Sequence, residues 1–341
     1  MNTILQTQAL YKSFGAKTSW LAQQAQRFSS RPRTNKIVHA VNGVSLELRR
    51  GEVLGLVGES GCGKSTFGRM VAGIIEPTAG AMTVNGQAVR HSGPDSIHRK
   101  VQMVFQNPYG SLNPRLRIDK SISEAALYHG LVSRAEADTF VKNLLRDVGL
   151  DPHYASRYPH QFSGGQRQRI AIARALAMQP EVLVCDEAVS ALDVSVQAQI
   201  LNLFLDLRAA RNLTYLFISH NLSVVEYLSD RVAIMYMGSI VELADTATLF
   251  NAPAHPYTRA LIADAPRLDS TPPVHRPLPS ELPNPMSLPG GCTFHPRCPM
   301  AMERCKVEAP ALTEIAPGHI GACHLIGNHA KVQVVWPMKA A

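Results

Sequence analysis

Four short apolar runs along the chain predict the strands of a parallel sheet. They are EVLGLVG at 52–58, VQMVF at 101–105, EVLVCDE at 181–187 and TYLFIS at 214–219. Nearly continuous, β-branched runs of this length are typical of strands that are buried on both faces. Stretches with a helical pattern lie between the strands, at 64–74, 164–178 and 196–210. This alternation predicts an α/β fold in which helices cover a mostly parallel sheet.

The same patterns divide the chain into three parts. Residues 1–245 carry the alternating pattern, and the mostly helical stretch at about 117–178 predicts a helical subdomain inserted between two strands. Residues 246–289 become dense in proline, which predicts a linker or an extended wrap. Residues 290–341 comprise a short cysteine-bearing module and a tail.

Composition supports a folded protein made and kept in the cytosol. Of the 341 residues, 45% are apolar and 18% are charged, which is ordinary for a globular protein and wrong for a disordered one. The start lacks the pattern of a signal peptide, and no uncharged apolar run reaches about 18 residues. The net charge is +8, with basic residues clustered at 27–36. Such a cluster suits nucleic acid, an anionic membrane surface or a solvated loop.

The stretch GESGCGKST at 58–66 predicts a phosphate-binding loop. It fits the pattern G-x-x-x-x-G-K-[ST], follows a predicted strand and opens a predicted helix. Glycines let the backbone N–H groups turn inward around an anion, the lysine adds a charge for the β- and γ-phosphates, and the next hydroxyl binds Mg²⁺. A plain glycine turn is the alternative interpretation. The nucleotide-binding candidates are Gly58, Ser60, Gly61, Cys62, Gly63, Lys64, Ser65 and Thr66.

Two adjacent acids supply the second half of the predicted site. Asp186 and Glu187 stand where a predicted buried strand ends, and ligands of open α/β sheets bind at the carboxyl ends of strands. One carboxylate can hold Mg²⁺, and the next can orient or deprotonate an attacking water. Adjacent acids at a strand end are usually only solvated. This pair indicates a catalytic site only because it follows a phosphate loop.

Further motifs make the chain resemble ATP-binding cassette (ABC) ATPases. FSGGQRQR at 162–169 resembles the family's signature sequence. Gln106 in VFQNP, SALD at 190–193 and His220 in FISH follow the family's order. The resemblance implies the ABC ATPase fold, with an antiparallel N-terminal sheet beside the mostly parallel one, and the use of ATP and Mg²⁺.

The resemblance also implies a role for each motif. Glu187 would be the general base, His220 would contact the γ-phosphate, and Gln106 would touch Mg²⁺ or the attacking water. Mg²⁺ would be held through Ser65, Gln106 and Asp186. The signature residues would contact the nucleotide of an opposite ATPase subunit, and the SALD residues would form a loop at the dimer interface. These two sets are Ser163, Gly164, Gly165 and Gln166, and Ser190, Ala191, Leu192 and Asp193.

An aromatic residue near the start is the candidate for stacking on adenine. YKSFG at 11–15 matches the place where the family carries such a residue, which makes Phe14 the first choice and Tyr11 the second. The alternative interpretation is a core aromatic at the end of an edge strand.

Three longer stretches resemble a narrower group, the ATP-binding subunits of bacterial dipeptide and oligopeptide importers. They are QNPYGSLNPRLRI at 106–118, HPYTRALIADAP at 255–266 and LPSELPNPMSLPGGCTFHPRCP at 278–299. The resemblance implies a second ATPase subunit, commonly a related chain, together with two membrane-spanning permease subunits and an extracytoplasmic binding protein. It places the chain peripherally on the cytoplasmic face of the bacterial inner membrane. Nickel and glutathione importers belong to the same group, so a solute other than peptide stays open.

Four cysteines near the end predict a metal that replaces a hydrophobic core. Cys292, Cys298, Cys305 and Cys323 are spaced C-x5-C-x6-C-x17-C, with His295, His319 and His324 close by. Cytosolic thiols are better interpreted as free thiols or ligands than as disulfides. Similar modules in the importer group carry a [4Fe-4S] cluster, which the resemblance therefore implies. Zn²⁺ and uncoordinated structural thiols are the alternatives, and Cys185 is expected to be a core residue.

Two other functions fit the ATPase motifs less well. A soluble ABC ATPase that acts on ribosomes or DNA commonly carries two cassettes in one chain, whereas this chain has one, so no nucleic acid partner is expected. A regulatory subunit that does not hydrolyse ATP would not need Glu187, His220 and Ser163 together.

Overall fold

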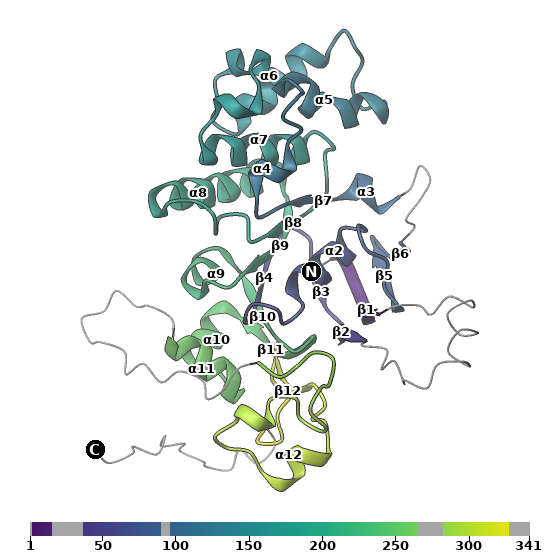
Figure 1. Ribbon diagram of the computed structural model, residues 1–341, viewed down its shortest axis with the longest axis vertical. Coiled ribbons are helices and arrows are strands. Elements are labelled where there is room, and N and C mark those ends of the chain that lie inside the picture. Colours follow the sequence, from purple (N-terminus) through teal and green to yellow (C-terminus); the bar gives the residue numbers. More distant parts are fainter. Residues whose placement is uncertain (1, 16–36, 90–95, 265–281, 327–341) are drawn as a thin grey trace, which may run out of the picture.

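The computed structural model describes residues 2–15, 37–89, 96–264 and 282–326, and it confirms an α/β protein in which helices cover a mostly parallel sheet. Figure 1 shows a helical region at the top, the N-terminal strands at the right and the cysteine-bearing segment at the bottom. The basic cluster at 27–36 lies outside the described residues.

The large sheet carries the four predicted strands at its centre and edge. Its order is β12-β13-β11-β10-β4-β9-β8-β7, and the run from β10 to β7 is parallel. The parallel strands are β4 (Val53–Val57), β7 (Val101–Val104), β8 (Val182–Asp186), β9 (Thr214–Ser219) and β10 (Arg231–Tyr236). The antiparallel strands are β11 (Ser239–Asp245), β12 (Thr313–Ala316) and β13 (His319–Gly321).

A second, antiparallel sheet forms from the N-terminal third of the chain, as the family resemblance implied. Strand β1 pairs with β2, β3 and β5, and β5 pairs with β6. Its strands are β1 (Thr3–Phe14), β2 (Val38–Val44), β3 (Glu47–Arg49), β5 (Ala79–Val84) and β6 (Gln87–Ala88).

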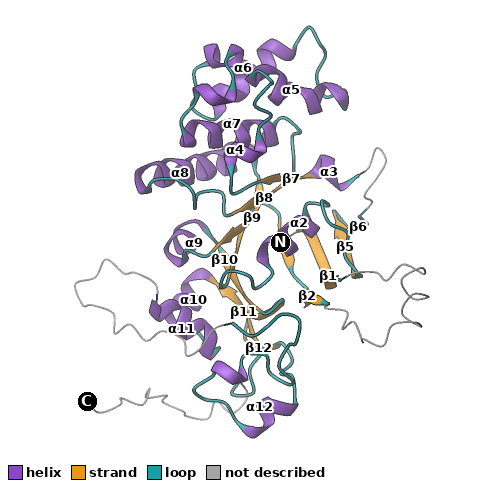
Figure 2. Ribbon diagram, in the orientation of Figure 1, coloured by secondary structure: helices purple, strands orange, loops and turns teal. Residues whose placement is uncertain are grey.

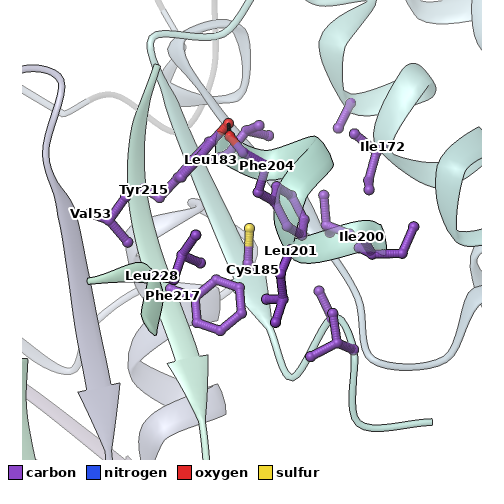
Figure 3. Close-up of a cluster of buried hydrophobic side chains, with 14 of the residues drawn as sticks. Val53, Ile172, Leu183, Cys185, Ile200, Leu201, Phe204, Tyr215, Phe217 and Leu228 are labelled. Carbon is purple, nitrogen blue, oxygen red and sulfur yellow. Dashed lines mark hydrogen bonds between the residues drawn. The ribbon is translucent and has the colours of Figure 1, made fainter. Parts of the chain in front are cut away.

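Two hydrophobic cores lie on opposite faces of the large sheet, because successive side chains of a strand point to opposite faces. Leu54 and Leu216 join the core toward the antiparallel sheet and α2 (Lys64–Val71), whereas Val53 and Tyr215 join the other core. Cys185 belongs to this second core and is fully buried, and Figure 3 shows its sulfur among apolar side chains. Cys185 is therefore a core residue, as predicted.

The helices of the second face include the insertion predicted at about 117–178. That stretch lies between β7 and β8 and contains α5 (Ile118–Tyr128), α6 (Ala137–Asp147), two short 3₁₀ turns, η1 (Pro152–Ser156) and η2 (Pro159–Gln161), and α7 (Gly164–Leu176). Further helices between β5 and residue 264 are seen in Figure 2. They are α3 (Ile97–Lys100), α4 (Pro108–Ser111), α8 (Val194–Arg211), α9 (Leu222–Leu228), α10 (Thr246–Asn251) and α11 (Pro256–Asp264). Within the described ranges, no helix is long and apolar enough to cross a membrane.

The cysteine-bearing segment is joined to the large sheet. It contains the 3₁₀ turn η3 (His295–Arg297) and α12 (Glu303–Val307) before the hairpin of β12 and β13. Strand β13 pairs with β11, where Glu242 lies opposite Gly321. The residues that the sequence sets apart as 290–341 thus continue the main sheet in their described part.

Candidate functional site

The phosphate loop connects β4 to α2 in a conformation that requires glycine. Gly63 has φ +107°, and a Cβ there would lie 2.1 Å from the carbonyl oxygen of Ala40. At Gly58 a Cβ would lie 2.2 Å from the carbonyl oxygen of Met235. These close approaches hold the loop against the N-terminal sheet and β10, and only a residue without a side chain permits them.

Lys64 places its ammonium group inside this loop. The side chain is buried, and Nζ donates hydrogen bonds to the carbonyl oxygens of Gly58, at 2.7 Å, and Glu59, at 2.9 Å. The neighbouring Cys62 is also buried, and burial raises the pKa of its thiol. Cys62 therefore serves the loop as a small core residue, and Lys64 contributes a buried positive charge to the loop.

A cavity of about 480 Å³ opens over the loop, a volume within the usual range for small-molecule sites. Most of the predicted nucleotide-binding residues line it, together with Gln106 and Glu187. The complete lining is Phe14, Val38, His39, Ala40, Ser60, Gly61, Cys62, Gly63, Lys64, Ser65, Thr66, Gln106, Glu187, Met237, Gly238 and Pro285.

The predicted catalytic residues form a connected polar group at the carboxyl ends of the strands. Glu187 Oε2 accepts a hydrogen bond from Gln106 Nε2 at 2.9 Å, and Glu187 Oε1 lies 3.3 Å from Nδ1 of His220. Glu187 has a positive φ of 49°, which is uncommon for a residue with a side chain and marks a strained turn after β8. The structure thus brings together the three residues that the sequence assigns to catalysis.

The predicted magnesium ligands lie beside this group. Ser65 Oγ donates a hydrogen bond to Asp186 Oδ1 at 2.7 Å. Burial raises the pKa of the Asp186 carboxyl, and the hydrogen bond from Ser65 partly offsets this rise. A hydroxyl and a carboxylate are oxygen donors that suit Mg²⁺, so the residues present fit the ion.

The rest of the cavity lining combines the predicted Phe14 with residues that the sequence did not reveal. Phe14 lines it from the end of β1 and is 42% exposed, whereas Tyr11 does not line it. Val38 and His39 contribute from β2, and the His39 N–H donates to the carbonyl oxygen of Pro285 at 3.2 Å. No local motif marks Val38, His39 or Pro285, because their place depends on pairings between distant segments.

The signature residues stand apart from this cavity. Ser163 caps α7, where its hydroxyl accepts from the N–H of Gln166 at 3.3 Å and Gln166 Oε1 accepts from the N–H of Ser163 at 3.0 Å. None of the four signature residues is in the cavity lining. The N–H groups at the start of α7 therefore do not face this cavity.

The SALD loop contacts Gln106 of this polar group and lies beside the start of α7. Ser190 lies 3.2 Å from Gln106 Nε2 through its hydroxyl, and Asp193 precedes the first residue of α8. Leu192 Cδ2 would lie 3.6 Å from a Cβ at Gly164, and Val196 of α8 would lie 2.5 Å from one at Gly165. Ala191 lies between these contacts in the chain. A substitution at Gly165 would therefore push the signature helix away from α8.

The four candidate cysteines come together around one small cavity. Cys292, Cys298, Cys305 and Cys323 all line it, and His295 and His324 do so too. Burial raises the pKa of the thiols of Cys292 and Cys323 and brings that of Cys298 to about 11. His319 lies away from this cavity.

The donor set suits a metal group built on sulfur, since soft thiolates are the ligands of iron-sulfur clusters and zinc. In the part of the chain that the structure describes, however, no group of three or more His, Cys, Asp or Glu side chains is placed to hold a metal ion. The fold therefore gathers the four thiols without closing them around a single ion.

Comparison with known proteins gives this geometry its family. The family profile described as ABC transporter matches residues 41–190, and the one described as oligopeptide/dipeptide transporter, C-terminal region, matches residues 241–305. The oligopeptide transport ATP-binding protein AppF of Bacillus subtilis is 49% identical over 295 residues, which cover 84% of this chain and 90% of AppF. The di/tripeptide transport ATP-binding protein DppF of Pseudomonas aeruginosa is 51% identical over 292 residues, which cover 84% of this chain and 90% of DppF.

A solved structure supports the same assignment at the level of the fold. The protein cbiO1 from Clostridium perfringens, part of the ABC transporter complex cbiONQ, matches with a TM-score of 0.61 at 24% identity. The match covers 74% of this chain and 92% of cbiO1, which confirms the predicted ABC ATPase fold. The chain therefore belongs to the ABC transporter family, among the ATP-binding proteins of the oligopeptide and dipeptide transporter type.

Proposed function

We propose that this chain is the ATP-hydrolysing subunit of an importer that carries peptides across the bacterial cytoplasmic membrane. The observation that carries the proposal is a single cavity lined by Lys64 and Glu187, with His220 lying 3.3 Å from the Glu187 carboxylate. The chain is also 49% identical to AppF and 51% identical to DppF over the matched residues. Residues 1–245 are the ATPase domain, 246–289 a family-specific helix and linker, and 290–341 the cysteine module and tail.

The polar group over the loop is arranged for hydrolysis of a bound nucleotide. The loop N–H groups and Lys64 bind the phosphates, and Phe14 stacks on the base. Ser65, Gln106 and Asp186 would hold Mg²⁺, whose chemistry is to offset negative charge on the phosphates. Glu187 takes a proton from water as the water oxygen bonds to the γ-phosphorus and the bond to ADP breaks, while His220 donates a hydrogen bond to the γ-phosphate.

Hydrolysis is expected to need two ATPase subunits. The start of α7 does not line the cavity of its own chain. We infer that Ser163 and its neighbours serve the nucleotide of a second subunit, which we take to be a related chain. Binding of ATP across such an interface favours the closed pair alone. That difference in affinity supplies the movement that the permease uses.

The membrane assembly is the part of the proposal that purification tests directly. Affinity purification of the tagged chain from detergent-solubilised native membranes is expected to recover two permease subunits and a second cassette ATPase. The extracytoplasmic binding protein encoded with them can then be screened against peptides, glutathione and nickel chelates. Recovery of ribosomes or DNA without a membrane subunit would contradict both the transport role and the position on the cytoplasmic face.

We infer that the four cysteines of the C-terminal module hold a [4Fe-4S] cluster, because they supply four sulfur donors around one cavity. After anaerobic purification, the chain is expected to contain about four iron and four acid-labile sulfide per molecule by that stoichiometry. A Cys298→Ser variant is expected to lose iron, whereas Cys185→Ser, which alters the core of the large sheet, is expected to keep it. Stoichiometric zinc in a colourless protein would contradict the cluster.

A further inference from the structure

A charged contact joins the cysteine module to the phosphate loop. The guanidinium of Arg297 donates two hydrogen bonds to the carboxylate of Glu59, from Nη1 to Oε2 at 2.7 Å and from Nη2 to Oε1 at 2.9 Å. Arg297 is the residue before Cys298, and Glu59 directly follows the first glycine of the loop. The side chain of Arg297 is 4% exposed and that of Glu59 is 25% exposed. Water therefore screens this two-pronged pair only weakly.

The backbone of Glu59 makes a second contact that holds the loop. The N–H of Glu59 donates to the hydroxyl of Tyr257 at 3.0 Å, and Tyr257 belongs to α11. The ring of Phe294, from the cysteine module, packs against those of Tyr257 and Tyr236 with centroids 5.4 and 5.3 Å apart. Aromatic packing thus holds Tyr257, which contacts the loop, against the cysteine module that carries Arg297.

A buried acid connects the module to the start of α11 as well. Glu242 of β11 is completely buried and lies 2.7 Å from His319 Nε2 of β13. Its two oxygens also accept hydrogen bonds from the N–H groups of Ala254, at 2.7 Å, and His255, at 2.9 Å. Tyr257 follows His255 by two residues. Glu242 therefore holds both β13 of the cysteine module and the segment that carries Tyr257.

The charge of Glu59 makes its partner important for the nucleotide. A free carboxylate in a phosphate loop would repel the triphosphate, and it would attract the ammonium of Lys64, which already contacts the Glu59 carbonyl oxygen at 2.9 Å. The fork of Arg297 neutralises this carboxylate and holds it on the side of the cysteine module. The pair thereby leaves Lys64 for the phosphates.

We propose that Arg297 is a positioning residue of the nucleotide site, through which the cysteine module sets the affinity for ATP by neutralising Glu59. The inference rests on the proposed role of the 58–66 loop as the ATP site. Arg297 acts on the nucleotide through Glu59 and the loop, so the expected effect is on ATP binding and not on the chemical step.

Nucleotide titrations of the purified full-length chain with a fluorescent ATP analogue test this proposal. Arg297→Ala is expected to weaken binding about tenfold, since it leaves an unpaired carboxylate in the loop that binds the phosphates. Arg297→Lys is expected to weaken it about threefold, because lysine keeps the charge without the fork. The double variant Arg297→Ala, Glu59→Gln is expected to recover most of the lost affinity. In the assembled transporter, the KM for ATP should rise, while kcat should stay within about twofold of the value of the unaltered protein.

Arg304→Ala is the matched control, since Arg304 lies in the same module and pairs with Glu308 on the exposed surface. Unchanged affinity in Arg297→Ala would overturn the proposal, and so would a loss that Glu59→Gln does not relieve, which would mean that Arg297 only supports the fold. If Arg297→Ala does not fold, Arg297→Lys and its double variant decide by the same criterion. Normal binding in Lys64→Ala would instead contradict the loop as the ATP site.

Discussion

Replacing Glu187 by glutamine is expected to lower ATP turnover by roughly 10²- to 10⁴-fold, the usual contribution of a general base, while ATP still binds. Glutamine keeps the shape of the side chain but cannot accept the proton of the attacking water. Its amide can still accept a hydrogen bond from Gln106, which lies 2.9 Å from the carboxylate. Because the loop and Lys64 are untouched, the variant should trap ATP instead of hydrolysing it.

Phosphate release by the assembled transporter and retention of labelled ATP by the variant measure the two halves of this expectation. Glu181→Gln is a suitable control, because Glu181 precedes the same strand at its other end and forms a surface ion pair with Arg50. Hydrolysis at the unaltered rate in Glu187→Gln would refute the role of general base. Loss of ATP retention would mean that Glu187 supports the site and not the proton transfer.

Local patterns in the sequence predicted the centre of the site because its parts are local. The apolar run ending at Asp186 is a buried strand, and parallel strands bring their carboxyl ends to one edge of the sheet. For that reason the amino-acid sequence alone suffices to place Asp186, Glu187 and His220 together, since they stand at or just after the ends of β8 and β9. The glycines of the loop likewise report a backbone conformation that few other residues adopt.

The contacts that join distant segments around the site escaped prediction. His39 meets Pro285 through one backbone hydrogen bond, and Arg297 meets Glu59 across 238 positions of sequence. Neither pair leaves a periodic signal. The same holds for β13, which has three residues and is recognisable only from its pairing with β11. The sequence therefore set the cysteine module apart from a sheet that it in fact extends.

Lys64→Ala is expected to weaken ATP binding by on the order of 10²-fold or more, the usual result of truncating one partner of a buried charge-assisted contact. The ammonium is buried in the loop, and among the described residues Lys64 is the only lysine or arginine that lines the cavity. Alanine removes that charge and also frees the carbonyl oxygens of Gly58 and Glu59. Both losses weaken binding of the triphosphate. The freed carbonyl oxygens repel the phosphates, and the loop loses the contacts that hold its shape.

Titration with a fluorescent ATP analogue measures the affinity, and thermal unfolding of the ligand-free chain shows whether the loop alone is altered. Lys142→Ala is the control, since Lys142 pairs with Asp138 on the surface of α6 and should leave binding unchanged. Lys64→Arg is expected to bind ATP poorly too, because the bulkier guanidinium must enter a site where the lysine is only 4% exposed. Tight binding in Lys64→Arg together with loss in Lys64→Ala would show that charge alone suffices. Tight binding of ATP by both variants would mean that the nucleotide site is not at this loop.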